Sequence, residues 1–147
     1  MAPTQSDADL ADRLGRFRAR MFPVLAIMFL IQQMAFFSNP PAERAVDHVR
    51  IGAWVAMTAV ILFVLNSRGF WFRPAKVRAM IDDEVTRSNR TSAMHWGFVA
   101  AMLAGIVVYV VQGVTQFTAR EAIHLIVSAG IVMALMRFGL LERRSYA

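Results

Sequence analysis

Histidines are the residues of this sequence whose chemistry is most distinctive. Neutral imidazole is a common metal and haem ligand, and the chain contains His48, His95 and His124. His48 and His124 each stand near the start of an apolar block, and we expect them at the same level of a membrane. They form a weak candidate for a haem or metal site. His95 belongs to the opposite level, roughly 30 Å away along a helix, and cannot share that site.

A second group of polar residues is expected at the level of His48 and His124. Amides and hydroxyls inside a membrane can join helices by hydrogen bonds, and the sequence favours this interpretation. Alternatively, they line a polar vestibule open to the periplasm, which would support a small homo-oligomeric channel or carrier. The candidate vestibule residues are Gln32, Gln33, Gln112, Gln116 and Ser128.

Several kinds of chemistry are excluded by the residues that the sequence lacks. The chain has no cysteine, and therefore no disulfide, thiolate nucleophile or Cys-ligated zinc. No Asp, Glu, Lys or Arg stands in the middle of an apolar block, where a proton-coupled transporter would place one. No phosphate-binding loop, Ser/His/Asp set or zinc-protease motif occurs. We predict no catalytic residue and no cofactor, and thus a non-enzymatic protein.

Four apolar blocks must position these side chains. The chain has 147 residues, of which 57% are apolar, and about 20 apolar residues are needed to cross a hydrocarbon core of ~30 Å. The sequence predicts an all-α, up-down-up-down bundle of four transmembrane helices over residues 21–38, 45–66, 93–112 and 120–140. Residues 1–20 and 141–147 are expected to be cytoplasmic tails. The loop 67–92 is expected to carry a short amphipathic helix before the third transmembrane helix.

The placement of the basic residues predicts the orientation of the bundle. Only Arg44, Arg50 and Arg120, of 16 Lys and Arg residues, lie outside the two tails, the loop 67–92 and the adjoining helix ends. Cytoplasmic segments of membrane proteins retain an excess of such cations. We therefore predict an inner membrane of bacterial type with both termini in the cytoplasm. The net charge of +6 then results from the basic residues of the cytoplasmic segments, and it does not indicate nucleic-acid binding.

A stripe of small residues and a charged loop predict how the protein could dock a partner. The third helix repeats a small residue at every fourth position, which lets another helix approach closely. The preceding loop carries charges of both signs. The main functional prediction is an accessory, assembly or regulatory subunit that binds a membrane-protein partner through these residues. They are Ala93, Gly97, Ala101 and Gly105 in the stripe, and Arg78, Asp83, Arg87 and Arg90 in the loop.

Overall fold

The computed structural model describes residues 5–38, 45–67, 79 and 81–146 of the chain. These residues contain four long helices, α1 (Gln5–Ser38), α2 (Ala45–Asn66), α4 (Glu84–Val111) and α5 (Ala119–Ser145). Each of the four is long and apolar enough to cross a membrane. The prediction of an all-α protein with four potential membrane-spanning helices is therefore confirmed.

The helix boundaries agree with the sequence prediction for α2 and differ for the other helices. α1 begins at Gln5 instead of residue 21, and α5 extends to Ser145, so most of both predicted tails is helical. α4 begins at Glu84, so residues 84–92 of the predicted loop 67–92 are helical. The apolar blocks locate only the part of each helix that lipid would cover, whereas a helix continues as long as its backbone hydrogen bonds do. Arg78 and the first part of the predicted amphipathic segment lie outside the described residues, and its last part, from Glu84 on, belongs to α4.

Side-chain caps fix the starts of α4 and α5. The Asp83 carboxylate accepts a hydrogen bond from the Thr86 backbone N–H at 2.7 Å. Thr118 and Glu121 form a reciprocal capping box, in which each side chain accepts a hydrogen bond from the backbone N–H of the other. Such caps satisfy N–H groups that a helix leaves unpaired in its first turn.

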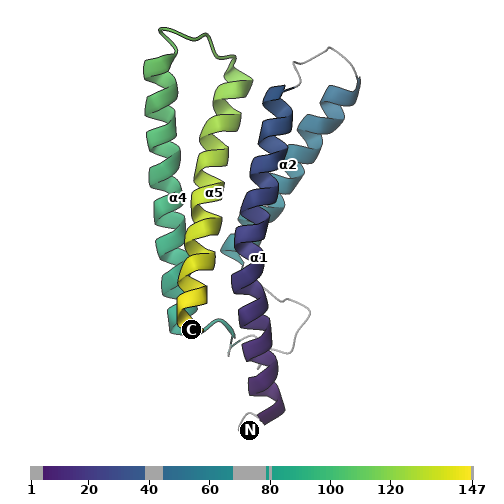
Figure 1. The fold of residues 1–147 in the computed structure, drawn as a ribbon, viewed down its shortest axis with the longest axis vertical. Coiled ribbons are helices and arrows are strands. Elements are labelled where there is room, and N and C mark those ends of the chain that lie inside the picture. The colour runs from purple at the N-terminus through teal and green to yellow at the C-terminus, as the bar shows by residue number, and fades with distance from the viewer. Residues whose placement is uncertain (1–4, 39–44, 68–78, 80, 147) are drawn as a thin grey trace.

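α5 is the central helix of the bundle, with α4 on one side and α1 on the other (Figure 1). The start of α1 and the end of α5 lie at the same end of the molecule, which we call the terminal end. The turn between α4 and α5 lies at the opposite end, the turn end (Figure 1). α2 packs by fewer side chains, chiefly Trp54, Ile61 and Leu65.

The small-residue stripe of α4 packs against α5. A Cβ atom added to Gly97 would lie 2.8 Å from the Gly130 carbonyl oxygen and 2.9 Å from the Ala134 Cβ. Gly130 in turn faces Ala101. This close approach is therefore used inside the chain, between α4 and α5, and docking of a partner by the stripe stays a prediction. The pattern was a sound indicator of close helix packing, but it did not say which helix would pack there.

Adding a methyl group to Gly97 should destabilise the protein. The Gly97→Ala variant would force α4 away from the backbone of α5, and we expect a loss of about 1 to 3 kcal/mol in unfolding free energy. Gly105→Ala is the matched control, because its added Cβ would meet only Ile126 Cδ1 at an ordinary 3.7 Å. Thermal melting of the detergent-solubilised variants measures both effects. Equal melting temperatures would contradict the packing described here.

α1 joins α5 through aromatic and proline contacts. The rings of Phe22 and Phe138 meet edge to face with centroids 4.8 Å apart. Gly139 lies against Pro23, so that an added Cβ would come 2.5 Å from the Pro23 Cδ. A proline within a membrane-spanning helix is tolerated where neighbouring helices support the backbone. These contacts hold α1 at a fixed rotation, which decides which of its polar residues face inward.

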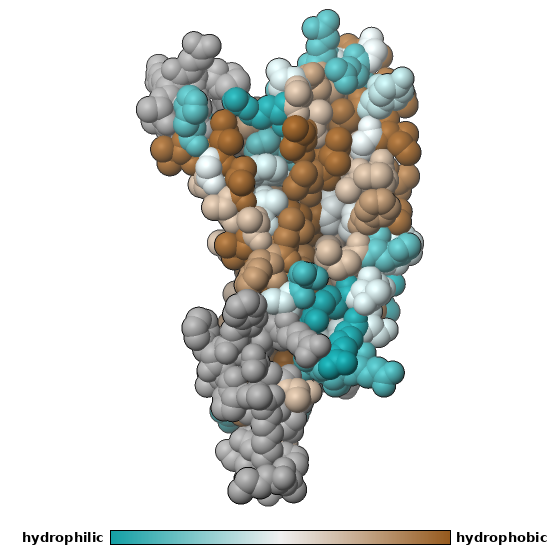
Figure 2. Space-filling model, turned by 180° about the vertical axis from the view of Figure 1, so that it is seen from behind, coloured by the Kyte–Doolittle hydropathy of each residue, from teal (hydrophilic) through white to brown (hydrophobic). Residues whose placement is uncertain are grey.

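Large apolar side chains cover the outside of the bundle. Examples are Phe63 on α2 and Ile106 and Val110 on α4, each more than half exposed. On the face seen in Figure 2, apolar residues gather in a broad band between hydrophilic residues at the top and at the lower right. An apolar belt between polar ends is the surface expected of a protein whose helices face lipid.

Candidate functional site

His124 is the most enclosed polar residue at the turn end of the bundle. The residue is 3% exposed, and its ring lies between two aromatic rings. Phe36 of α1 stacks on it at a centroid distance of 3.9 Å, and Trp54 of α2 stacks at 4.0 Å. The single imidazole of α5 therefore connects three helices. We call Phe36, His124 and Trp54 the histidine sandwich.

Gln33 fixes the hydrogen-bonding state of this histidine. The Nδ1 atom of His124 lies 3.0 Å from Gln33 Oε1. An amide oxygen can only accept, so Nδ1 donates, and in the neutral ring Nε2 is then the acceptor. The same contact directs the Gln33 Nε2 group away from the histidine. This Nε2 atom is buried and has no hydrogen-bond partner in the part of the chain that the structure describes.

Ser128 supplies a second buried polar atom near the same place. It stands one helical turn after His124, on the same face of α5, and it is 7% exposed. A serine inside a helix commonly donates its hydroxyl to the carbonyl one turn earlier. Within the described residues, the Ser128 Oγ atom has no hydrogen-bond partner. Two unpaired polar atoms thus lie close to one enclosed imidazole.

A cavity of about 680 Å³ opens beside these atoms, between α1 and α5, with Ala100 of α4 at its edge. We call it the α1–α5 cavity. Gln33, His124 and Ser128 are the polar residues of its deep wall, and Ser38 stands at the end of α1. Met34 and Phe37 at its mouth are exposed apolar side chains. The remaining lining residues are apolar: Leu30, Leu125, Ala129, Val132, Met133 and Met136.

The structure brings together only part of the predicted vestibule. Gln33 and Ser128 share the α1–α5 cavity, as the sequence led us to expect for a polar group at this level. Gln32 is half-buried and does not line the cavity. Gln112 and Gln116 are exposed at the turn end, away from the cavity wall. A vestibule that includes these last two residues stays a prediction, and the cavity itself has a mostly apolar lining.

The predicted histidine pair is placed in two different environments. His124 is enclosed by Phe36 and Trp54, whereas His48 is exposed on α2 and does not line the cavity. Among the described residues, no group of three or more His, Asp and Glu side chains is arranged to hold a metal ion. His95 is exposed and meets the Trp96 ring edge to face.

Several residues of the site were absent from the sequence prediction. Phe36 and Trp54 are aromatic residues within long apolar blocks, where nothing in their spacing distinguishes them from lipid-facing neighbours. Spacing also fails to single out the methionines of the cavity wall, Met34, Met133 and Met136. In the structure their flexible side chains line the cavity. The sequence contained one indirect indication that Phe36 faces the site. Phe36 follows Gln33 by three residues, so the two share a helix face once Gln33 is known to point inward.

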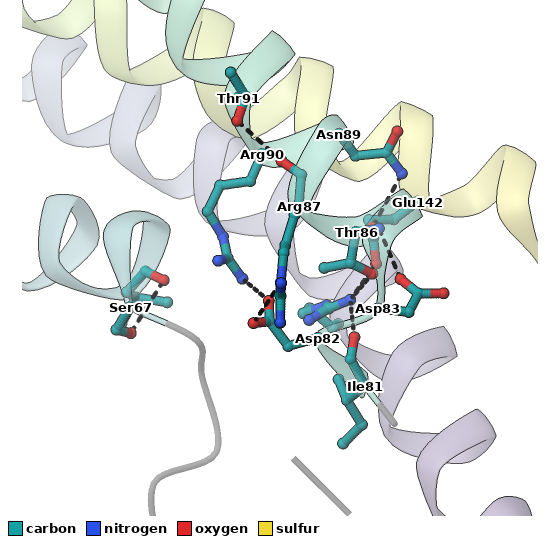
Figure 3. A network of polar contacts seen from close by, with 12 residues as sticks. Ser67, Ile81, Asp82, Asp83, Thr86, Arg87, Asn89, Arg90, Thr91 and Glu142 are labelled. Atoms are coloured by element: carbon teal, nitrogen blue, oxygen red, sulfur yellow. Dashed lines mark hydrogen bonds and ion pairs between the residues drawn. The ribbon is translucent and has the colours of Figure 1, made fainter. Parts of the chain in front are cut away.

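A second polar cluster lies at the terminal end. The Arg18 guanidinium of α1 forms an ion pair with the Glu142 carboxylate of α5, and both side chains are at least 93% buried. Arg18 also donates to Thr86 Oγ1 at 3.0 Å, and Asn89 donates to Glu142 at 3.1 Å. We call Arg18, Thr86, Asn89 and Glu142 the terminal cluster. It joins α1, α4 and α5, and Figure 3 shows Asn89 directed toward Glu142.

Tyr146 covers one side of this cluster. Its hydroxyl lies against Gly15 of α1, where any larger side chain would collide with it. Burial raises the pKa of the Tyr146 hydroxyl above its ordinary value. The tyrosine therefore stays uncharged at neutral pH, as its packing against α1 requires.

The charged residues predicted to dock a partner have contacts within the chain. Asp83 caps α4, as described above. Arg87 and Arg90 both pair with the buried carboxylate of Asp82, at 3.3 and 3.0 Å, and Figure 3 shows the two side chains converging on it. The Arg87 side chain remains 60% exposed. Asp83 and Arg90 thus also hold the start of α4, and their role in docking a partner stays a prediction.

A smaller cavity of about 230 Å³ lies near the terminal cluster. Its polar wall contains Arg18, Arg90 and Ser67. Arg18 is paired with Glu142 and Arg90 with Asp82, and the Ser67 hydroxyl donates to a backbone carbonyl. Since the positive charges are already balanced, this cavity is a weaker candidate for a ligand site than the α1–α5 cavity.

The fold and its surface define the class of the protein, a multi-pass membrane protein with four candidate spanning helices. Comparisons of the chain with models of protein families, with curated proteins and with solved structures gave no match.

Proposed function

We propose that this chain is a non-enzymatic membrane protein that binds a lipid-soluble small molecule in the α1–α5 cavity. The observation that carries the proposal is the pair of buried, unpartnered atoms in the cavity wall, Gln33 Nε2 and Ser128 Oγ. Each unpaired buried polar group costs about 1 to 3 kcal/mol, and a ligand that pairs with it recovers that cost. The cavity volume falls within the range of roughly 300 to 1,000 Å³ that is usual for small-molecule sites.

The mouth of the cavity supports entry from the lipid. Leu30, Met34, Phe37 and Met133 line the cavity and are each more than 40% exposed. They lie within the apolar parts of α1 and α5, where the surface of the bundle would contact acyl chains. A ligand that dissolves in the bilayer can reach Gln33 and Ser128 along this route. A water-filled pore would need more polar walls, so a binding or carrier role is favoured over a channel.

The proposal includes an orientation for the chain. With an up-down-up-down order and both termini in the cytoplasm, the terminal end faces the cytoplasm and the α1–α5 cavity lies in the periplasmic half of an inner membrane. The support is the concentration of Lys and Arg in the segments at the terminal end, together with the common position of both chain ends. A reporter fused after Ala147 that is active only in the periplasm would contradict it.

Filling the cavity tests the proposed function. We expect the wild-type protein, purified in mild detergent, to retain a small molecule in a fixed ratio detected by native mass spectrometry. Ala129→Phe places a ring in the cavity and should abolish this retention while the helices and the melting temperature are preserved. Ala56→Phe on the exposed face of α2 is the matched control and should retain the molecule. The same occupancy in wild type and Ala129→Phe would contradict the proposal.

The accessory or regulatory role predicted from the sequence is the second candidate. The observation that favours it is Arg87, whose charged side chain remains largely exposed at the terminal end after pairing with Asp82. A partner that uses this surface should accompany the tagged protein in a fixed ratio during purification from its native membrane. Arg87→Ala should then release the partner and leave the small molecule of the α1–α5 cavity in place. Purification of a single chain or a homo-oligomer would contradict the accessory role.

A further inference from the structure

The α1–α5 cavity combines a deep polar wall with an apolar mouth, and this arrangement limits what can bind there. The inference below rests on the proposed function and specifies its ligand. Among the described residues that line the cavity, Gln33, Ser38, His124 and Ser128 carry polar groups, and none of these lining residues carries a permanent charge. Burying an ionised group without an opposite charge is costly. The cavity therefore disfavours a carboxylate, a phosphate or a quaternary ammonium head.

The hydrogen-bond inventory of the wall specifies an acceptor on the ligand. Gln33 offers its Nε2 hydrogens, because its Oε1 already accepts from His124. Ser128 offers a hydroxyl that can donate or accept. Both side chains are more than nine-tenths buried, and neither atom has a hydrogen-bond partner among the described residues. A ligand carbonyl or ether oxygen can accept from both donors, whereas an alkane would leave them unpaired.

We propose that the ligand is a neutral amphiphile whose head carries a carbonyl-type oxygen, held by Gln33 and Ser128 in the deep part of the cavity. Its apolar chain lies along the methionine-lined wall and leaves through the mouth between Met34 and Met133. Methionine side chains adapt to chains of different shape, so the head gives the selectivity and the tail gives affinity. The chemistry is that of a lipid-soluble ketone, quinone or ester.

Four brominated alkyl probes with one chain length test this inference. Their heads are a methyl ketone, a carboxylate, a quaternary ammonium and no polar group at all. Binding is read in phosphatidylcholine nanodiscs by quenching of Trp54, which stacks on His124, in a Trp71→Phe/Trp96→Phe background. Affinities are corrected for partition into empty nanodiscs. We expect the ketone to bind at least about tenfold more tightly than either ion, and about fivefold more tightly than the alkane.

Ser128→Ala separates recognition of the head from packing. It removes one donor with little change in volume, and it breaks no recorded hydrogen bond. The ketone should lose about fivefold in affinity, while the alkane should be unaffected. Gln33→Met also removes a donor, although it leaves the His124 Nδ1–H group unpaired, so it serves as the second variant.

The possible outcomes distinguish this inference from the proposed function. If an ionic probe binds as tightly as the ketone, or the alkane binds equally well, the head group inferred here is wrong and the cavity remains a binding site. If Ser128→Ala weakens all four probes equally, the hydroxyl supports packing and the inference also fails. If every probe quenches Trp54 fluorescence equally in the wild type and in Ala129→Phe, the cavity is not the binding site and both proposals are wrong.

Discussion

Replacing Glu142 with alanine is expected to reduce the unfolding free energy by about 3 to 5 kcal/mol. The carboxylate is 1% exposed and lies against the Arg18 guanidinium, which is itself buried. Its removal leaves a positive charge enclosed among α1, α4 and α5, and it also removes the acceptor of the Asn89 amide. Chemical or thermal unfolding of the detergent-solubilised protein, followed by loss of helicity, measures the effect.

Two further variants show whether charge is the cause. Arg18→Met combined with Glu142→Leu replaces the pair by apolar side chains of similar size and should recover most of the lost stability. Arg87→Ala removes an ion pair whose cation is largely exposed, and screening by solvent should keep its effect below about 1 kcal/mol. If the double variant is as unstable as Glu142→Ala, the terminal cluster acts through shape and not through charge compensation.

The sequence predicted the helices well because a bilayer imposes a length and an apolar composition on anything that crosses it. That constraint does not determine the residues at which a helix begins and ends. The terminal cluster illustrates the consequence, since Arg18 and Glu142 both belong to segments that the apolar pattern assigned to tails. The available signal was the isolation of Glu142, the only acidic residue after Glu121 in a stretch that also contains Arg137, Arg143 and Arg144.

The candidate site was less predictable because an apolar pattern does not fix the rotation of a helix about its axis. Gln32 and Gln33 are neighbours, about 100° apart on the helix, and lipid-facing positions resemble core positions in composition. Packing of Phe22 and Pro23 on α5 turns Gln33 inward and leaves Gln32 half-buried. The stripe containing Gly97 shows the same limit, since its spacing indicated a close helix contact without identifying α5 as the partner.

Replacing His124 with alanine is the other change from which we expect a large effect. The imidazole is stacked between Phe36 and Trp54 and holds Gln33 by a hydrogen bond, so the variant creates a cavity and leaves the Gln33 amide without that partner. Loss of a packed ring together with a buried hydrogen bond should cost about 3 kcal/mol. α2 should loosen first, because Trp54 is one of the few side chains by which it packs.

Trp54 fluorescence provides the measurement that is local to this site. In the Trp71→Phe/Trp96→Phe background, His124→Ala should change the intensity and the emission maximum of Trp54, because the ring stacked on the indole is lost. His48→Ala is the control, since His48 is exposed on the same helix as Trp54 and should leave both emission and melting unchanged. Unaltered emission in His124→Ala would contradict the histidine sandwich. A changed emission with full stability would instead mean that the sandwich orients Gln33 toward the cavity without holding α2 in place.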